Sequence, residues 1–218
     1  MLDPSLNSLV LGSVLLSRSE DLKPSLIENF IKFVISTKTK AQPHVLRSLQ
    51  PLLKSLNHDE FKGQILPAMS KAMLRNPELV MESISLILSS LSIDLSQYVG
   101  DLSKPFATQL HANDDMTRES AIKCVASLGL KASDSEAVDA LLKAIFAVLN
   151  GSEGKLSVAG HKMSLLSAAA ALADNSMLGK NSTVKGRLRA TIFKSADTAH
   201  LIASTKQHNN IRCIFSAD

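Results

Sequence analysis

Aromatic side chains and cysteines are scarce in this chain of 218 residues. It has no Trp, a single Tyr and 4% aromatic residues in all, although 45% of its residues are hydrophobic. A core with so few rings relies on Leu, Ala, Val and Ile, the residues that fill the space between packed helices. The two cysteines, Cys124 and Cys213, lie far apart in the sequence, which argues against a disulfide framework and suits a reducing compartment.

Long hydrophobic runs are also missing. No stretch reaches the roughly 18 apolar residues that cross a bilayer, and even the run at 165–173 is interrupted by Ser167. The first residues include Asp3, Glu20 and Asp21, where a secretory signal has a basic segment followed by an apolar one. We therefore expect a soluble, cytoplasmic chain that does not contact membranes.

Groupings of residues typical of catalysis are absent. The six histidines form no metal-ligand pair with an intervening Glu and do not stand beside the cysteines at zinc-ligand spacing. The string GSEGKL at 151–156 lacks the first Gly of a phosphate loop, and Leu156 stands where Ser or Thr is needed. We interpret it as a turn whose glycines adopt positive φ. The sequence predicts no enzyme, no cofactor, no metal and no small-molecule substrate.

Helix signals recur along most of the chain. Prolines or helix-capping residues open apolar segments with three- and four-residue spacing near Pro4, Pro24, Pro43, Asn57 or His58, Pro77, Asp94, Asp114 or Asp115, Ser133 or Asp134, and Leu156. The acidic pairs Asp59–Glu60, Asp114–Asp115 and Glu78–Glu82 fall in first turns of these predicted helices, where carboxylates favour the positive end of the dipole. Helix stabilisation explains them without acid–base chemistry.

The spacing of these segments predicts a repeat fold. Alternate helices start near residues 43, 77, 116 and 158, at intervals of about 34, 39 and 42 residues. This range favours an all-α, HEAT-type helical solenoid of about 9–10 helices, in antiparallel pairs stacked as a superhelix. Pro51, Pro67 and Pro105 lie inside predicted helices, where they either bend the helix or mark shorter helices.

Charge separates the end of the chain from the rest. Residues 1–150 contain 15 Lys and Arg against 16 Asp and Glu, whereas residues 151–218 contain 9 against 4. We expect a HEAT array over 1–173 and a basic, divergent and partly disordered segment over 174–218. Its cations could attract phosphate backbones or simply form a solvated face; the densest group is Lys180, Lys185, Arg187, Arg189 and Lys194.

Several strings give a resemblance that periodicity cannot supply. They are EFK at 60–62 with Leu66-Pro67, LRNPE at 74–78, DLSQY at 94–98, GSEGKL at 151–156 and KMSLLS at 162–167. In wording and spacing, residues 20–173 resemble the N-terminal HEAT region of the general control non-derepressible translational activators. The resemblance implies a ribosome-associating scaffold that promotes activation of the kinase acting on initiation factor two alpha. Past about Asp174 the family pattern ends, and the family's kinase-binding region has no counterpart in this sequence.

A docking surface is the site that such a scaffold would use. We expect cations near helix ends and turns to contact ribosomal RNA phosphates or acidic ribosomal protein, and the candidates are Lys54, Lys62, Lys71, Arg75 and Lys155. By the resemblance, the kinase binds only through regions absent from this chain. The alternative is a generic HEAT-repeat adaptor that binds a protein ligand and has no ribosomal role.

Overall fold

The computed structural model of the chain describes residues 4–15, 20–36 and 40–175. These residues form helices and turns, with no strand among them, which confirms the all-α prediction. The chain folds as two compact units, Met1–Ile93 and Asp94–Asp218. The predicted end of the array at residue 173 and the divergent segment 174–218 stay predictions, because residues 176–218 lie outside the described residues.

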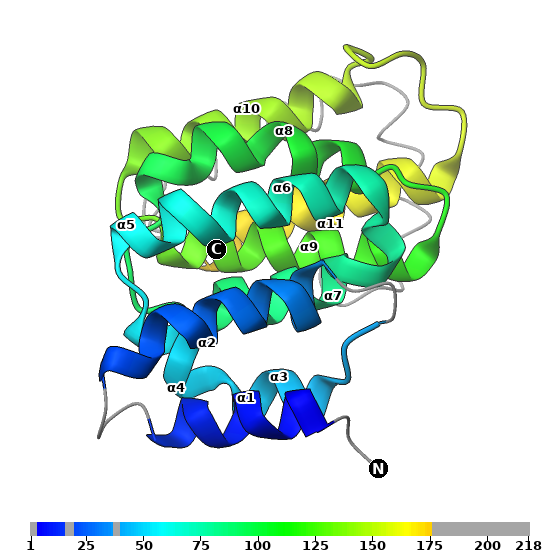
Figure 1. Cartoon of the computed structure of the whole chain (residues 1–218). Coiled ribbons are helices and arrows are strands. Elements are labelled where there is room, and N and C mark those ends of the chain that lie inside the picture. Colours follow the sequence, from blue (N-terminus) through cyan, green and yellow to red (C-terminus); the bar gives the residue numbers. More distant parts are fainter. Residues whose placement is uncertain (1–3, 16–19, 37–39, 176–218) are drawn as a thin grey trace. The chain divides into compact units, whose positions relative to one another are not determined.

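The described residues of the first unit form five helical segments, some of them made of shorter elements in close succession. In chain order the elements are α1 (Pro4–Leu15); η2 (Glu20–Leu22), α2 (Lys23–Phe30) and η3 (Ile31–Ile35); α3 (Pro43–Ser48) and α4 (Gln50–Ser55); α5 (His58–Glu60), η4 (Phe61–Ile65) and α6 (Leu66–Arg75); and α7 (Pro77–Ser90). Their starts agree with the prolines and capping residues of the sequence. Figure 1 shows these stretches from blue to green-cyan.

Alternate helices pack against one another in this unit. The helix α3–α4 contacts both α1 and α7, while α6 contacts η3 from the preceding helix. Two layers result, one of α1, α3–α4 and α7, the other of α2–η3 and α5–η4–α6. The apolar faces between them include the fully buried Phe30, Leu49, Leu53 and Phe61. Stacking of alternate helices is the arrangement expected of helical repeats.

The second unit repeats this arrangement. It consists of η5 (Ser96–Tyr98), α8 (Val99–Gln109), α9 (Asp115–Lys131), α10 (Ser135–Leu149) and α11 (Ala159–Asn175). Here α8 packs on α10 and α9 packs on α11, so two layers form again (Figure 1). Each unit thus has the packing of helical repeats, whereas the superhelical stack of the whole array stays a prediction.

The three internal prolines act in three different ways. Pro51 follows a break at Leu49, and the free backbone N–H of Leu52 donates to the Ser13 hydroxyl of α1 at 3.3 Å. Pro67 follows the π-helical turn η4, which widens the helix where the proline ring would meet the carbonyl four residues earlier. Pro105 lies inside α8 without interrupting it. Shorter elements therefore occur near Pro51 and Pro67 but not at Pro105.

Candidate functional site

The five candidate cations are all exposed, and they are divided between the two units. Lys54 lies in the last turn of α4, Lys62 in η4, Lys71 and Arg75 on α6, and Lys155 in the loop between α10 and α11. Lys71 and Arg75 share one face of α6 because they are four residues apart. Lys155 belongs to the second unit and the other four to the first.

Five other cations in the described part of the chain form ion pairs. Two pairs link different elements. Lys23 of α2 pairs with Glu60 of α5, with 2.8 Å between Nζ and Oε2, and Lys40, in the loop before α3, pairs with Glu82 of α7 at 2.7 Å. Three more lie within single helices, namely Arg118–Asp115, Lys123–Glu119 and Lys143–Asp139. None of the candidate cations pairs with a described carboxylate. Their charges are therefore available to a partner.

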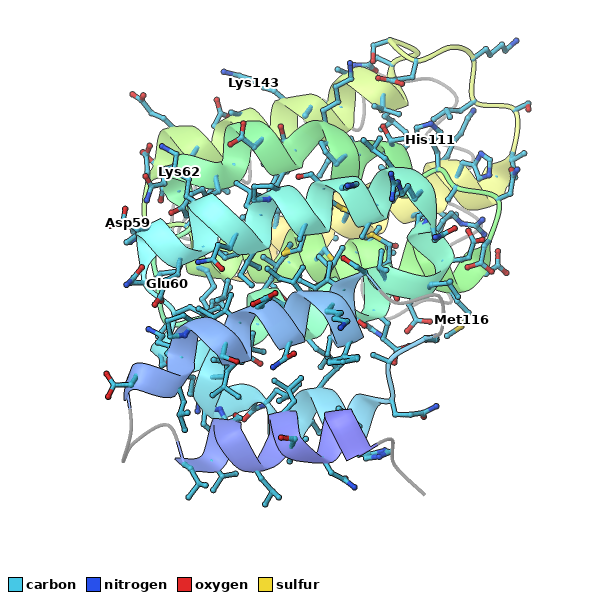
Figure 2. The ribbon with its side chains drawn as sticks, in the orientation of Figure 1. Asp59, Glu60, Lys62, His111, Met116 and Lys143 are labelled. Carbon is cyan, nitrogen blue, oxygen red and sulfur yellow. The ribbon has the colours of Figure 1, made fainter. Side chains whose placement is uncertain are left out.

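The turn between α4 and α5 is held by an interaction that the sequence did not reveal. Asn57 and Glu60 form a reciprocal capping box, in which the Glu60 backbone N–H donates to Asn57 Oδ1 at 2.8 Å and the Asn57 N–H to Glu60 Oε2 at 2.9 Å. The same Oε2 accepts Lys23, whose Nζ also donates to the Ser55 carbonyl at 2.6 Å. Lys23 thus joins the end of α4 to the start of α5, beside which Lys62 lies (Figure 2).

Arg47 is a further exposed cation that our choice of candidates missed. It lies on α3 and forms no ion pair with a described residue. The helix that runs from Pro43 to Ser55 has no Asp or Glu. This lack of acidic residues is a sequence signal that would have identified Arg47 together with Lys54.

The loop that carries Lys155 has the backbone predicted for it. Gly151 has φ 93° and Gly154 has φ 104°, and both glycines lie in the turn that follows α10. A side chain would strain this conformation, which explains both glycines without a phosphate-binding role. In the part of the chain that the structure describes, no group of three or more His, Cys, Asp or Glu residues could hold a metal ion.

A network of hydrogen bonds joins the loops in front of α8 and α10. Asp94 Oδ1 accepts the Ser96 N–H at 3.0 Å, the Ser96 hydroxyl at 2.7 Å and the Ser133 N–H at 3.1 Å, while Oδ2 accepts the Ser133 hydroxyl at 2.7 Å. The Leu95 N–H donates to the Lys131 carbonyl at 3.0 Å. Partial burial acts to raise the pKa of Asp94, but the hydrogen bonds from Ser133 and Ser96 outweigh it and hold the pKa well below its usual range.

Two histidines and an arginine meet at the opposite end of α8. The rings of His111 and His161 lie edge to face with centroids 6.3 Å apart. Arg118 donates from Nη1 to the carbonyls of Ala112 and Asn113 and pairs with Asp115. Burial, the Arg118 charge and His111 together lower the pKa of His161. Since Arg118 already has these partners, we assign the cluster to the joining of α8, α9 and α11. Figure 2 shows His111 there.

Cys124, the cysteine among the described residues, lacks the features of a reactive nucleophile. Cys124 is fully buried on α9, and burial raises the pKa of its thiol far above the usual range, which keeps it in the unreactive protonated form. Cys213 lies outside the described residues. In the described part of the chain, no helix combines the length and the apolar character needed to cross a membrane.

Comparison with known proteins identifies the family. The family described as "Stalled ribosome sensor GCN1 N-terminal" matches residues 23–156, which is more than half of the chain. The chain belongs to this family. It is 39% identical over 171 residues to the mouse and human proteins named "Stalled ribosome sensor GCN1", and 33% identical over 154 residues to "Protein ILITYHIA" of Arabidopsis thaliana. This confirms the resemblance found in the sequence.

The matches cover this chain and its relatives very unequally. They include 78% of this chain for the mouse and human proteins and 71% for the plant protein, but only 6% of the length of each relative. No solved structure matches the chain. Sequence similarity therefore establishes that the chain belongs to the GCN1 N-terminal family. The functions of the much longer relatives can only be proposed for this chain.

Proposed function

We propose that this chain is a ribosome-docking module that associates with ribosomes through exposed cations on its helices. The observation that carries the proposal is the match of residues 23–156 to the GCN1 N-terminal family, whose relatives are named as sensors of stalled ribosomes. The module would act in the cytoplasm, as part of the response to stalled ribosomes or amino-acid starvation. It would work as a scaffold and not as an enzyme.

The described surface has properties that suit docking. Helical repeats present an extended surface built from successive helices, so recognition comes from shape and charge and needs no enclosed pocket. The candidate cations Lys54, Lys62, Lys71 and Arg75 add positive charge to the first unit, and Lys155 adds it to the second. Positive side chains of this kind bind ribosomal phosphates or acidic ribosomal protein.

Activation of the kinase is assigned to sequence outside this chain. The family resemblance associates kinase binding with a region that has no counterpart here, and the relatives are many times longer. We therefore expect the isolated chain to associate with ribosomes without recruiting the kinase.

Sedimentation through sucrose gradients tests the proposal. The purified 218-residue chain is mixed with ribosomes at several salt concentrations, and its distribution in the gradient is measured. We expect co-migration that weakens as salt rises, because cations that bind phosphates release counterions. If the chain migrates as a free species even at the lowest salt, ribosome association is wrong and a generic adaptor is favoured.

Charge variants test the candidate residues separately. A variant with all five candidates replaced by Glu should lose most co-migration at low salt. The triple variant Lys62→Gln/Lys71→Gln/Arg75→Gln removes three of the candidates. Its matched control is Lys104→Gln/Lys123→Gln/Lys143→Gln, which also removes three exposed cations from helices. Equal retention of both on ribosomes would show that the candidate surface is wrong, although ribosome association itself would stand.

A further inference from the structure

One stretch of the first unit is basic throughout and contains no carboxylate. Residues 29–58 have five Lys and Arg residues and no Asp or Glu. The structure places the second half of this stretch on the helix α3–α4, which occupies the middle of the layer between α1 and α7. One face of this helix is buried, through Val45, Leu46, Leu49, Leu52 and Leu53. The opposite face is exposed and consists of His44, Arg47, Ser48, Gln50, Pro51 and Lys54.

Neighbouring carboxylates do little to neutralise this face. Glu60, at the start of α5, is bound by Lys23, and Glu82 on α7 is bound by Lys40. Two other acidic residues are close in sequence or on the adjacent helix, Asp59 and Glu78, and neither forms an ion pair. Each lies in the first turn of a helix, where its negative charge interacts favourably with the positive end of the helix dipole. Arg47 and Lys54 are therefore not paired with a described carboxylate.

The two cations are spaced for contact with a strand of nucleic acid. Arg47 on α3 and Lys54 on α4 both lie on the exposed side, on either side of the break at Leu49, and seven residues correspond to about 10 Å of helix. One strand of a duplex places a phosphate about every 3.4 Å along its axis. The distance thus spans about three phosphates. The Gln50 amide, between the cations, and the His44 imidazole, one turn before Arg47, can donate hydrogen bonds to the same backbone.

The other side chains of the face favour RNA over a protein partner. Protein interfaces depend on apolar or aromatic anchors that fill pockets, and this face offers Pro51 alone. It also lacks aromatic rings on which bases could stack, so the contact would be with phosphates and sugars and would not read base sequence. We propose that the exposed face of α3–α4 binds the phosphate backbone of ribosomal RNA through Arg47 and Lys54. This inference rests on the proposed ribosome association and names its partner.

The test compares two pairs of charge substitutions in the full 218-residue chain. Arg47→Gln/Lys54→Gln removes the proposed contacts. Lys104→Gln/Lys123→Gln removes the same charge from exposed positions of the second unit and is the control. Because the basic residues at 180–194 are common to all three proteins, their contribution cancels in the comparison. Binding is measured to intact ribosomes and to protein-free ribosomal RNA, across a salt series.

We expect the wild-type chain to bind both ligands, and Arg47→Gln/Lys54→Gln to bind protein-free RNA roughly tenfold more weakly than the control at low salt. The slope of log affinity against log salt should fall by about 1.4 to 1.8, or 0.7 to 0.9 for each lost phosphate contact. Binding to poly(U) and poly(A) should be equal within about twofold, because only the backbone is contacted. Circular dichroism should show the same helix content in all variants.

Each other outcome overturns a definite part of the reasoning. Binding to intact ribosomes without binding to protein-free RNA would make a ribosomal protein the partner, so the inference would fail while the proposed function stood. Equal binding of the two variants to RNA would exclude the α3–α4 face. Failure of the wild-type chain to bind either ligand would overturn both the inference and the proposed function.

Discussion

Replacement of Asp94 should weaken the second unit more than any other single change of an exposed carboxylate there. Asp94 accepts four hydrogen bonds, two from Ser96 and two from Ser133, and so joins the loops in front of α8 and α10. A hydrogen bond to a charged group contributes about 1.5–3 kcal/mol when buried. Asp94 is exposed, so we discount each bond to about 0.5 kcal/mol for solvent competition and expect Asp94→Ala to cost about 2 kcal/mol.

The charge of Asp94 gives the prediction a pH dependence. Its pKa is lowered in the folded state, so its stabilisation is present above the unfolded pKa of about 3.9 and is lost as pH falls through the folded pKa. The difference in unfolding free energy between wild type and Asp94→Ala should therefore be full at pH 7 and pH 5. It should shrink by about 1 kcal/mol at pH 3, because the unfolded carboxylate then gains a proton that the folded one resists.

Urea unfolding followed by circular dichroism at 222 nm measures both effects. At pH 7 a loss of about 2 kcal/mol lowers the folding equilibrium constant about 30-fold. Ser133→Ala should lose about a quarter of that free energy, because it removes the hydroxyl hydrogen bond and keeps the one from the backbone N–H. Asp101→Asn is the control, since Asp101 is an exposed carboxylate on α8 and should change stability by only a few tenths of a kcal/mol. The reasoning is refuted if Asp94→Ala unfolds at the same urea concentration as this control, or if its deficit does not change between pH 5 and pH 3.

Three further predictions concern buried or partly buried groups. Ser13→Ala should cost about 1–3 kcal/mol in urea unfolding, because the Leu52 N–H loses its acceptor in a buried position. Lys23 and Glu60 should show a coupling of about 1 kcal/mol in a double-mutant cycle measured by thermal unfolding, since their side chains are only 17% and 21% exposed. The thiol of Cys124 should resist a thiol-labelling reagent at pH 8 until the chain is unfolded by urea, because burial raises its pKa.

Each of these three has a control within the chain. Ser8→Ala changes an exposed serine of the same helix and should be within about 0.5 kcal/mol of wild type. Lys143 and Asp139 form a pair whose lysine is 77% exposed, and its coupling should be a few tenths of a kcal/mol. Cys213→Ser leaves Cys124 as the remaining thiol. Equal costs for Ser13→Ala and Ser8→Ala, equal couplings in the two pairs, or prompt labelling of native Cys124 would contradict the respective prediction.

Local sequence signals predicted where the helices begin. Pro43 and Pro77 stand in the first turn of α3 and α7, and Asn57 and Asp114 accept backbone N–H groups of the helices they precede. These signals work because a helix start needs a free acceptor or a residue without an N–H, and neighbouring residues supply both. Asn76 is an exception, since its side chain makes no capping hydrogen bond and Pro77 alone marks that start.

The charged surface was predicted only in part. Lys54, Lys62, Lys71 and Arg75 were chosen for their positions near helix ends, and all four are exposed. Arg47 was not chosen, although it lies on the exposed face of the same helix as Lys54. The sequence shows which residues are cations and where they lie along the chain. It does not show which cations pair with a carboxylate from a distant helix, as Lys23 does with Glu60 and Lys40 with Glu82.

The sequence by itself determined the all-α class, the starts of most helices and the family, because proline geometry, capping and apolar periodicity act over a few residues and similarity needs no coordinates. Two predicted starts were wrong, since α8 begins at Val99 and not at Asp94, and α11 begins at Ala159 and not at Leu156. Tertiary structure alone decided that Ser13 accepts the N–H left free beside Pro51, and that Asp94 joins Ser96 and Ser133. It also decided which cations of the described helices a carboxylate neutralises. These contacts link residues more than thirty positions apart, and only the packing of one helix on another fixes the distances between them.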